Sequence, residues 1–229
     1  MSKADDHGRY IKTPLSSYIS SGSSFPTPSL LTIAGKCVIK DKTVVGSAGG
    51  PVRIGWHVWI EEESRIEGCV KRGSAPQRNS PAGDDATTAA TTSSKSNKND
   101  GSDDLDESAA LAAAHYHTLS IGRNTFIGKG CVVKAREIGS SCYIGEGTMV
   151  GSRALVGDCV NVLENSVIPD DACYPPYTVV SGSPAAVVGD VEDWWGDEME
   201  FKAEERWQRF KDSLSLGQTQ GGETTTAQG

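Results

Sequence analysis

The sequence lacks the features that mark membrane, secreted and disulfide-bonded proteins. No apolar run approaches the roughly 18 residues that a membrane-spanning helix needs. The first residues, MSKADDHGRY, are polar and acidic, unlike a secretory signal. The six cysteines lie singly and form no C-x-x-C pair, so neither a zinc knuckle nor a redox pair is indicated. We therefore expect reduced thiols, no membrane insertion and a location in the cytoplasm.

Positive charge is also scarce. The 22 lysines and arginines are outnumbered by 30 aspartates and glutamates, so the formal net charge is -8. Proteins that bind nucleic acid usually carry a basic patch or stripe, and we therefore expect no nucleic-acid partner. A glycine-rich phosphate loop that opens a helix and a G-x-S-x-G nucleophile elbow are both missing, so the glycines need another explanation.

The sequence does contain an aliphatic residue at every sixth position over much of its length. The residues with this spacing form five triplets: Ile33, Ile39, Val45; Ile54, Ile60, Ile66; Ile121, Ile127, Val133; Ile138, Ile144, Val150; and Val156, Val162, Ile168. We interpret each triplet as one three-sided coil, in which every side is a short strand and every aliphatic residue points inward. A partial sixth coil is expected through Tyr174 and Val180.

A small residue often stands two positions before the aliphatic one, and a glycine often follows it. We assign the small residues to a second inward position, and they are Cys37, Thr43, Ser64, Thr125, Cys131, Cys142, Thr148, Ala154 and Ser166. Packing rather than reactivity is therefore expected for the three cysteines among them. The glycines are expected at corners, where a missing side chain permits an unusual φ or a close approach of backbone.

This hexapeptide pattern resembles that of left-handed β-helices, so we predict an all-β solenoid, a left-handed parallel β-helix with a C-terminal α-helix. The expected divisions are an N-terminal segment at 1–30, the β-helix at 31–184, the helix at 190–215 and a disordered tail at 216–229. A polar tract interrupts the repeat and predicts a disordered insertion at 71–114. The open strand edges at the two ends of the prism should be covered by a capping element or a partner.

The C-terminal helix is predicted from apolar residues that share one helical face. They follow steps of three and four along the chain: Met199, Ala203, Trp207, Phe210 and Leu214. The simpler interpretation is that this face packs along one side of the prism. The alternative is that aromatic residues of this region anchor a partner protein, as aromatic residues often do, and the candidates are Trp194, Trp195, Trp207 and Phe210.

Hexapeptide β-helices include γ-class carbonic anhydrases, acyltransferases and non-enzymatic assembly proteins, so the fold leaves the function open. Alignment with the carbonic anhydrases places Glu67, Lys129 and Lys134 where that family has its three zinc-binding histidines. Two lysines and a glutamate are not a zinc ligand set. The Arg-Gly-Asp of that family aligns with residues 46–48, which are Gly-Ser-Ala. We therefore predict no metal site.

An acyltransferase would need a general base, which is usually a histidine. The four histidines are His7, His57, His115 and His117, and no acid or substrate-binding element accompanies any of them in the sequence. We therefore expect no catalytic residue and no cofactor. The stretch SGSPAAVVGDV resembles the turn by which many hexapeptide acyltransferases leave their last coil. Acyl transfer to a small acceptor is accordingly the alternative function.

Several stretches carry a more specific likeness. The run VLENSVIPDDACYPPYTVVSGSPA, the coils GKCVIKDKTVV and VRIGWHVWIEEESRI, and the helical AEERWQRF resemble the dynactin subunit 5 family at corresponding spacing. Two departures stand beside the likeness: the insertion at 71–114 is longer than the loop of the family, and the Arg-Gly-Asp is absent.

The resemblance implies a non-enzymatic structural subunit of the dynactin pointed-end complex. The implied partners are dynactin subunit 6, dynactin subunit 4 and the pointed-end actin-related protein. It also implies support of dynein cargo binding through cargo adaptors, a role in microtubule-based transport and a place at the cytoskeleton. A scaffold with other partners, related to the carbonic anhydrases but free of metal, is a further possibility.

Overall fold

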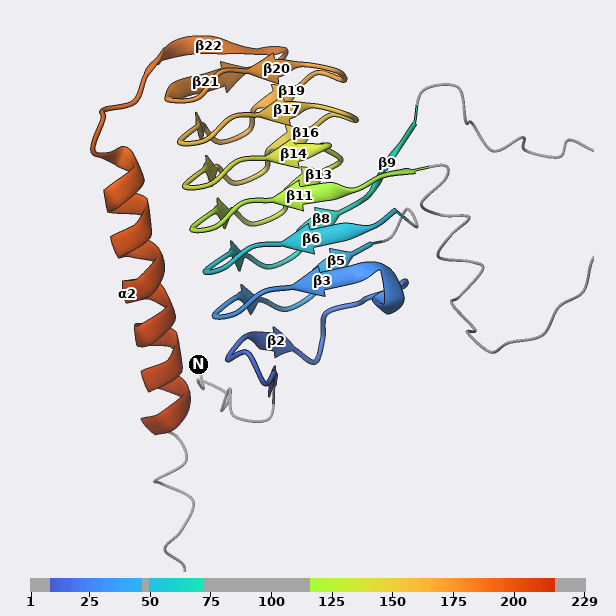
Figure 1. The fold of residues 1–229 in the computed structure, drawn as a ribbon, viewed down its shortest axis with the longest axis vertical. Coiled ribbons are helices and arrows are strands. Elements are labelled where there is room, and N and C mark those ends of the chain that lie inside the picture. Colours follow the sequence, from blue (N-terminus) through green and yellow to red (C-terminus); the bar gives the residue numbers. More distant parts are fainter. Residues whose placement is uncertain (1–8, 47–49, 72–115, 217–229) are drawn as a thin grey trace, which may run out of the picture.

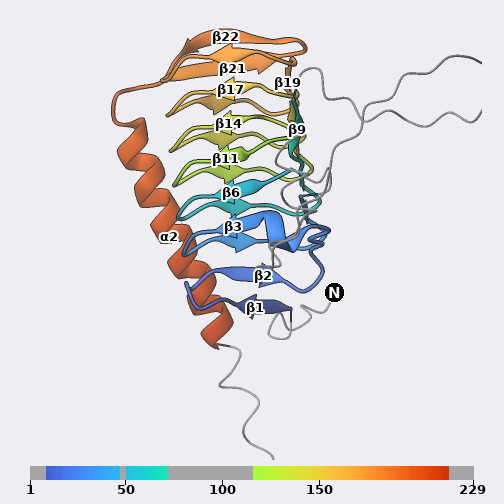
Figure 2. The ribbon, with the colours of Figure 1, turned by 45° about the vertical axis from the view of Figure 1, so that its right-hand side comes forward.

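The computed structural model describes residues 9–46, 50–71 and 116–216. Over these residues the chain forms a three-sided prism of short parallel strands, with one long helix along its flank (Figures 1 and 2). The predicted insertion and tail lie outside the described residues, apart from Lys71 and Leu216, as does the whole of 47–49.

The three sides are three sheets of mainly parallel strands, which we number in the order in which the chain visits them from residue 31 onward. Side 1 contains β3 (Leu31–Ile33), β6 (Val52–Ile54), β11 (Leu119–Ile121), β14 (Glu137–Ile138), β17 (Leu155–Val156) and β20 (Cys173–Tyr174). Side 2 contains β1 (Tyr10–Lys12), β2 (Tyr18–Ser20), β4 (Val38–Ile39), β7 (Trp59–Ile60), β12 (Phe126–Ile127), β15 (Tyr143–Ile144), β18 (Asn161–Val162), β21 (Thr178–Gly182) and β22 (Ala185–Asp190). Side 3 contains β5 (Val44–Val45), β8 (Arg65–Ile66), β13 (Val132–Val133), β16 (Met149–Val150) and β19 (Val167–Ile168). A 3-10 turn, η2 (Pro28–Leu30), leads into β3.

The coils begin where the six-residue spacing places them, at residues 33, 54, 121, 138 and 156. Equivalent aliphatic residues pair in register from one coil to the next, so that Ile121 lies beside both Ile54 and Ile138. All of the aliphatic residues of the five triplets are buried except Ile33, which is partly buried and packs against the others. The coil is left-handed, which confirms the predicted fold class (Figure 1).

The corner glycines are required by close approach rather than by an unusual φ. A Cβ added to Gly122 would lie 2.5 Å from the backbone of Gly139 in the next coil, and neither glycine has a positive φ. The left-handed conformation falls two residues later, at Asn124 and Ser141, each with a φ of 56°. Of the two reasons that the sequence left open, the structure therefore selects the close approach of successive backbones at these corners.

The small residues at the second inward position are buried, as predicted. Several of them donate a hydrogen bond to a corner carbonyl of the next coil: Ser64 Oγ to Gly128 O at 2.8 Å, Thr125 Oγ1 to Gly139 O at 3.0 Å and Cys142 Sγ to Gly157 O at 3.1 Å. Each such bond satisfies a buried acceptor and joins two coils. The side chain therefore contributes both volume and a cross-link.

Antiparallel strands cover both ends of side 2. At the N-terminal end β1 pairs with β2, which in turn pairs in parallel with β4, so strands of the solenoid occur upstream of residue 31. At the other end β22 folds back on β21. A separate antiparallel pair, β9 (Cys69–Val70) with β10 (Tyr116–His117), stands where the chain leaves the second coil and returns to begin the third.

The helix α2 (Trp195–Leu216) runs back along the prism from its C-terminal coil to its N-terminal hairpin (Figures 1 and 2). Met199, Ala203 and Trp207 are buried against the outer face of side 2, as the simpler interpretation expects. The ring of Phe210 makes edge-to-face contacts with Tyr10, Tyr18 and Trp59, at centroid distances of 4.9, 5.6 and 5.5 Å. No helix in the described part of the chain has the length and apolar character of a membrane span.

Replacing Gly122 with alanine should destabilise the chain by about 2 to 3 kcal/mol, because the added methyl would overlap the backbone of the next corner. Gly189→Ala in β22 is the matched control, since its added methyl meets nothing within 4 Å. The control should change stability by less than about 0.5 kcal/mol. Urea unfolding followed by circular dichroism measures both, and equal stabilities would contradict the close-approach explanation.

Cys173 should be the one fast-reacting thiol of the folded chain. It is exposed, whereas burial raises the pKa of Cys37 and Cys131 to about 11 and that of Cys142 to about 12. Since the thiolate is the reactive form, Ellman's reagent at about pH 8 should react rapidly with a single thiol. The rapid phase should disappear in Cys173→Ser, and a rapid phase that persists in this variant would contradict the inward placement of the cysteines.

Candidate functional site

Two of the three positions that correspond to zinc ligands lie together, and they form an ion pair. Glu67 and Lys134 follow β8 and β13 at the same corner of successive coils, where the backbone N–H of Glu67 donates to Val133 O at 2.8 Å. Lys134 Nζ lies 3.3 Å from Glu67 Oε2, and the Glu67 side chain is only 14% exposed. In a zinc-binding relative, the stacking of these two positions would bring two metal ligands together. In this chain it brings a glutamate and a lysine together.

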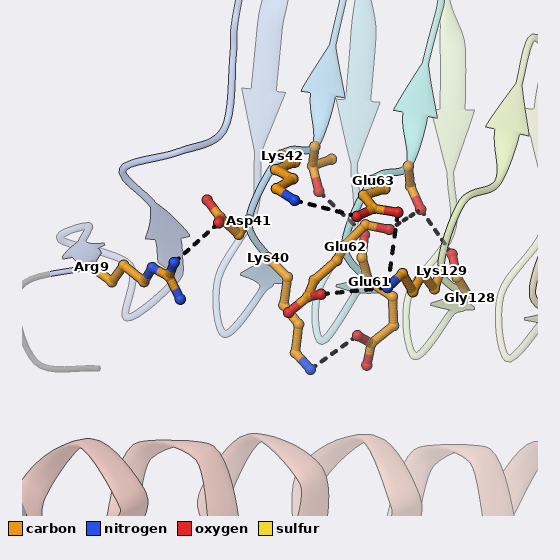
Figure 3. A network of polar contacts seen from close by, with 11 residues as sticks. Arg9, Lys40, Asp41, Lys42, Glu61, Glu62, Glu63, Gly128 and Lys129 are labelled. Atoms are coloured by element: carbon orange, nitrogen blue, oxygen red, sulfur yellow. Dashed lines mark hydrogen bonds and ion pairs between the residues drawn. The ribbon is translucent and has the colours of Figure 1, made fainter. Parts of the chain in front are cut away.

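The third position lies at a different corner. Lys129 follows β12 between sides 2 and 3, and its Nζ lies 3.9 Å from Glu62 and 3.8 Å from Glu63 of the preceding coil (Figure 3). Within 9–46, 50–71 and 116–216, no group of three or more His, Cys, Asp and Glu side chains is placed to hold a metal ion. The side chains at all three positions therefore take part in ion-pair contacts between successive coils.

The described histidines do not face a catalytic cleft. His57 has a φ of 56° at the corner between sides 1 and 2, and its Nε2 lies 2.8 Å from Glu204 Oε2 on α2. Lys36 Nζ lies 3.0 Å from the same carboxylate. A hydrogen bond from Gln208 and the charge of Lys36 hold the pKa of Glu204 below its usual value. His57 therefore helps to fix the helix, while His7 and His115 lie outside the described residues.

His117 lies on β10, paired with Cys69 of β9. Burial and the charges of Arg136, Lys71 and Arg153 lower the pKa of His117. Its imidazole is accordingly neutral at neutral pH, since the ordinary pKa of histidine is already near 6.5.

One flank of α2 is fastened to the corner between sides 1 and 2. Trp207 Nε1 donates to Ser16 O at 3.2 Å and Trp195 Nε1 donates to Ser141 O at 2.9 Å. Both acceptors belong to corner residues with a positive φ. Two of the four aromatic residues proposed as partner anchors are thus engaged within the chain, and Phe210 packs on side 2. Trp194 is 56% exposed, and its role at an interface stays a prediction.

The other flank of α2 borders an open groove that faces the corner between sides 2 and 3. Figure 3 shows the prism wall of this groove, with Lys40 and Glu61 directed toward the helix. The groove consists of two hollows of about 600 and 740 Å³, and both are lined by Lys202 and Arg206. The sequence reasoning missed Arg206, although its four-residue spacing from Lys202 on the polar face was a signal that could have found it.

The outer face of side 3 carries an apolar stripe. Its outward residues are Val44, Arg65, Val132, Met149 and Val167, of which Met149 is 51% exposed. The outer face of side 1 differs, since its outward residues include Thr32, Arg53, Ser120 and Glu137. Of the two sides that α2 leaves uncovered, side 3 is thus the less polar.

The family model of dynactin subunit 5 matches residues 108–216, which confirms the resemblance over the later coils and α2. No curated protein matches the sequence. Among solved structures, a hexapeptide transferase family protein from Anaplasma phagocytophilum is 12% identical, with coverage of 86% of this chain and 92% of its own and a TM-score of 0.46. The acetyltransferase domain of PglB from Neisseria gonorrhoeae is 17% identical, with coverage of 76% and 58% and a TM-score of 0.45. These scores carry no argument about function.

The ion pair of Glu67 and Lys134 should contribute a coupling free energy of about 0.5 to 1 kcal/mol, with solvent screening through the 43% exposed Lys134 included. A double-mutant cycle with Glu67→Gln and Lys134→Met, followed by urea unfolding, measures it. The pair of Lys42 and Glu63, whose side chains are 69% and 47% exposed, is the control and should give a coupling near zero. If the two pairs gave equal coupling free energies, the contact between Glu67 and Lys134 would not stabilise the stacking of the coils.

Proposed function

We propose that this chain is a non-enzymatic structural subunit of the dynactin pointed-end complex. The observation that carries the proposal is the match of residues 108–216 to the dynactin subunit 5 family. In this role it would assemble with dynactin subunit 6, dynactin subunit 4 and the pointed-end actin-related protein. It would act in the cytoplasm at the cytoskeleton and support dynein cargo binding and microtubule-based transport.

The side chains at the substituted zinc positions support a non-enzymatic role. Glu67 pairs with Lys134, and Lys129 pairs with Glu62 and Glu63, so each of the three contributes to the stacking of coils. His57 Nε2 likewise lies 2.8 Å from Glu204 Oε2 on α2. These contacts give each side chain a structural role that does not depend on a reaction.

The apolar stripe of side 3 supports the assembly part of the proposal. Parallel sheets are usually covered on both faces, and on this prism the outer face of side 2 is covered by α2. We assign the outer face of side 3, centred on Met149, to contact with another subunit of the complex. An exposed methionine suits such a contact, because its flexible side chain adapts to an apolar partner.

The alternative is acyl transfer to a small acceptor. It is favoured by the SGSPAAVVGDV turn, which forms the hairpin of β21 and β22, and by the neutral state of His117, which could accept a proton. Against it, His117 lies on a two-stranded ribbon away from that turn, because β10 pairs with β9 rather than with side 2. Measurement of acyl-coenzyme A consumption by the purified chain separates the two functions.

Affinity purification of the tagged chain from its native cells, followed by mass spectrometry, tests the proposed function. We expect the actin-related protein and other dynactin subunits among the recovered proteins. Met149→Glu should lower their recovery about tenfold, because it places a charge in an apolar contact. Arg53→Glu on side 1 is the control and should leave recovery unchanged. If the unmodified chain recovers no dynactin subunit, the proposal is wrong.

A further inference from the structure

Arg206 is a half-buried cation without an ion-pair partner. Its guanidinium lies 4.4 Å from the ring centroid of Phe126 and 5.8 Å from that of Trp59. Among the described residues it makes no hydrogen bond and no ion pair. The carboxylates nearest to it are engaged elsewhere, because Glu61 binds Lys40 at 2.9 Å and the indole N–H of Trp59 at 2.8 Å, and Glu205 binds Arg209 at 2.6 Å.

The chemistry of such a group points to an anionic ligand. Burial lowers the pKa of Arg206, which reflects the cost of removing its charge from water. Contact with two rings leaves the N–H donors of this guanidinium without hydrogen bonds among the described residues, and their fork matches the two oxygens of a carboxylate. A bound carboxylate would therefore supply the partner that the chain itself does not provide.

The shape of the groove around Arg206 suits an extended chain. The two hollows meet at Lys202 and Arg206, and together they are lined from Tyr10 in β1 to Ser181 in β21. Between these two strands, side 2 contains β2, β4, β7, β12, β15 and β18. At about 4.8 Å for each step between strands, the groove is roughly 30 Å long, which is the length of an extended segment of about ten residues.

We propose that this groove binds an extended acidic segment of a partner protein, with one Asp or Glu carboxylate paired to Arg206. Lys202 and Arg209 add positive charge beside it, since their exposed pairs with Glu198 and Glu205 on the helix surface are weak and exchange readily. Apolar side chains of the segment lie on Trp59 and Phe210. The inference does not depend on the dynactin assignment.

The test uses the full chain and labelled ten-residue peptides that alternate glutamate with leucine, with fluorescence anisotropy as the readout. A matched peptide carries glutamine in place of glutamate. We expect the glutamate peptide to bind at least about tenfold more tightly, as the loss of a charged hydrogen-bonded pair implies. Arg206→Met should weaken its binding by a similar factor, while Arg53→Met on side 1 should not.

Thermal unfolding separates a binding role for Arg206 from a structural one. If Arg206 serves a ligand, Arg206→Met keeps the packing on Phe126 and removes an unpaired cation, so its Tm should match or exceed the wild-type value within about 2 °C. A purely structural cation–π role predicts a lower Tm and unchanged peptide binding. Arg206→Lys keeps the charge but loses the fork, and it should bind with intermediate affinity.

Three results would overturn the proposal. The first is equal binding of the glutamate and glutamine peptides, or normal binding by Arg206→Met. The second is binding of a phosphoserine peptide alone, which would replace a carboxylate with a phosphate. The third is tight binding only after Asp5→Asn and Asp6→Asn substitution, which would make the N-terminal residues of this chain the occupant. None of these results alters the recovery of dynactin subunits, so the two proposals fail independently.

Discussion

The fold depends on backbone-to-backbone contact between successive coils. At corner after corner a glycine lies so close to the next coil that a Cβ at Gly122, Gly139 or Gly145 would approach backbone atoms within 2.5 Å. This closeness lets strands of only two or three residues pair in register, since each is held at both ends by the same stack. The inward serines, threonines and cysteines then bind the corner carbonyls of the neighbouring coil. Cohesion comes from repetition, because no single coil buries enough surface to persist alone.

The regular corners also determine where the helix lies and on which of its flanks a groove remains. Residues with a positive φ turn their carbonyls outward along the corner between sides 1 and 2, and Trp195 and Trp207 bind Ser141 and Ser16 there. Glu204 adds ion pairs to the same corner. On the opposite flank of the helix, Arg206 packs on Phe126 and Trp59 and borders the groove. Because the helix is attached along one flank, its other flank is already ordered. A ligand that binds there would not have to order the helix first.

Much of the fold could be predicted because the inward positions recur with a strict period. The aliphatic and small residues are placed as their spacing indicates, from Cys37 to Ile168. The reason for the glycines could not be read from spacing, since a missing side chain permits both close approach and a positive φ. The pairing of Glu67 with Lys134 needed the register across the insertion, which β6 and β11 establish. The setting of Arg206 could not be predicted from the sequence, because it depends on which side of the prism the helix crosses.

The pairing of β9 with β10 has a consequence for how this chain varies. Val70 lies beside Tyr116, so the segment between them leaves and re-enters the prism at neighbouring points, while β11 stacks directly on β6. The third coil is therefore seated on the second by direct pairing of these two strands. Lengthening a loop whose ends already meet costs only about 0.6 kcal/mol for each doubling. The scaffold can thus exchange one intervening segment for another during evolution, as a cassette, with little effect on the stability of the coils.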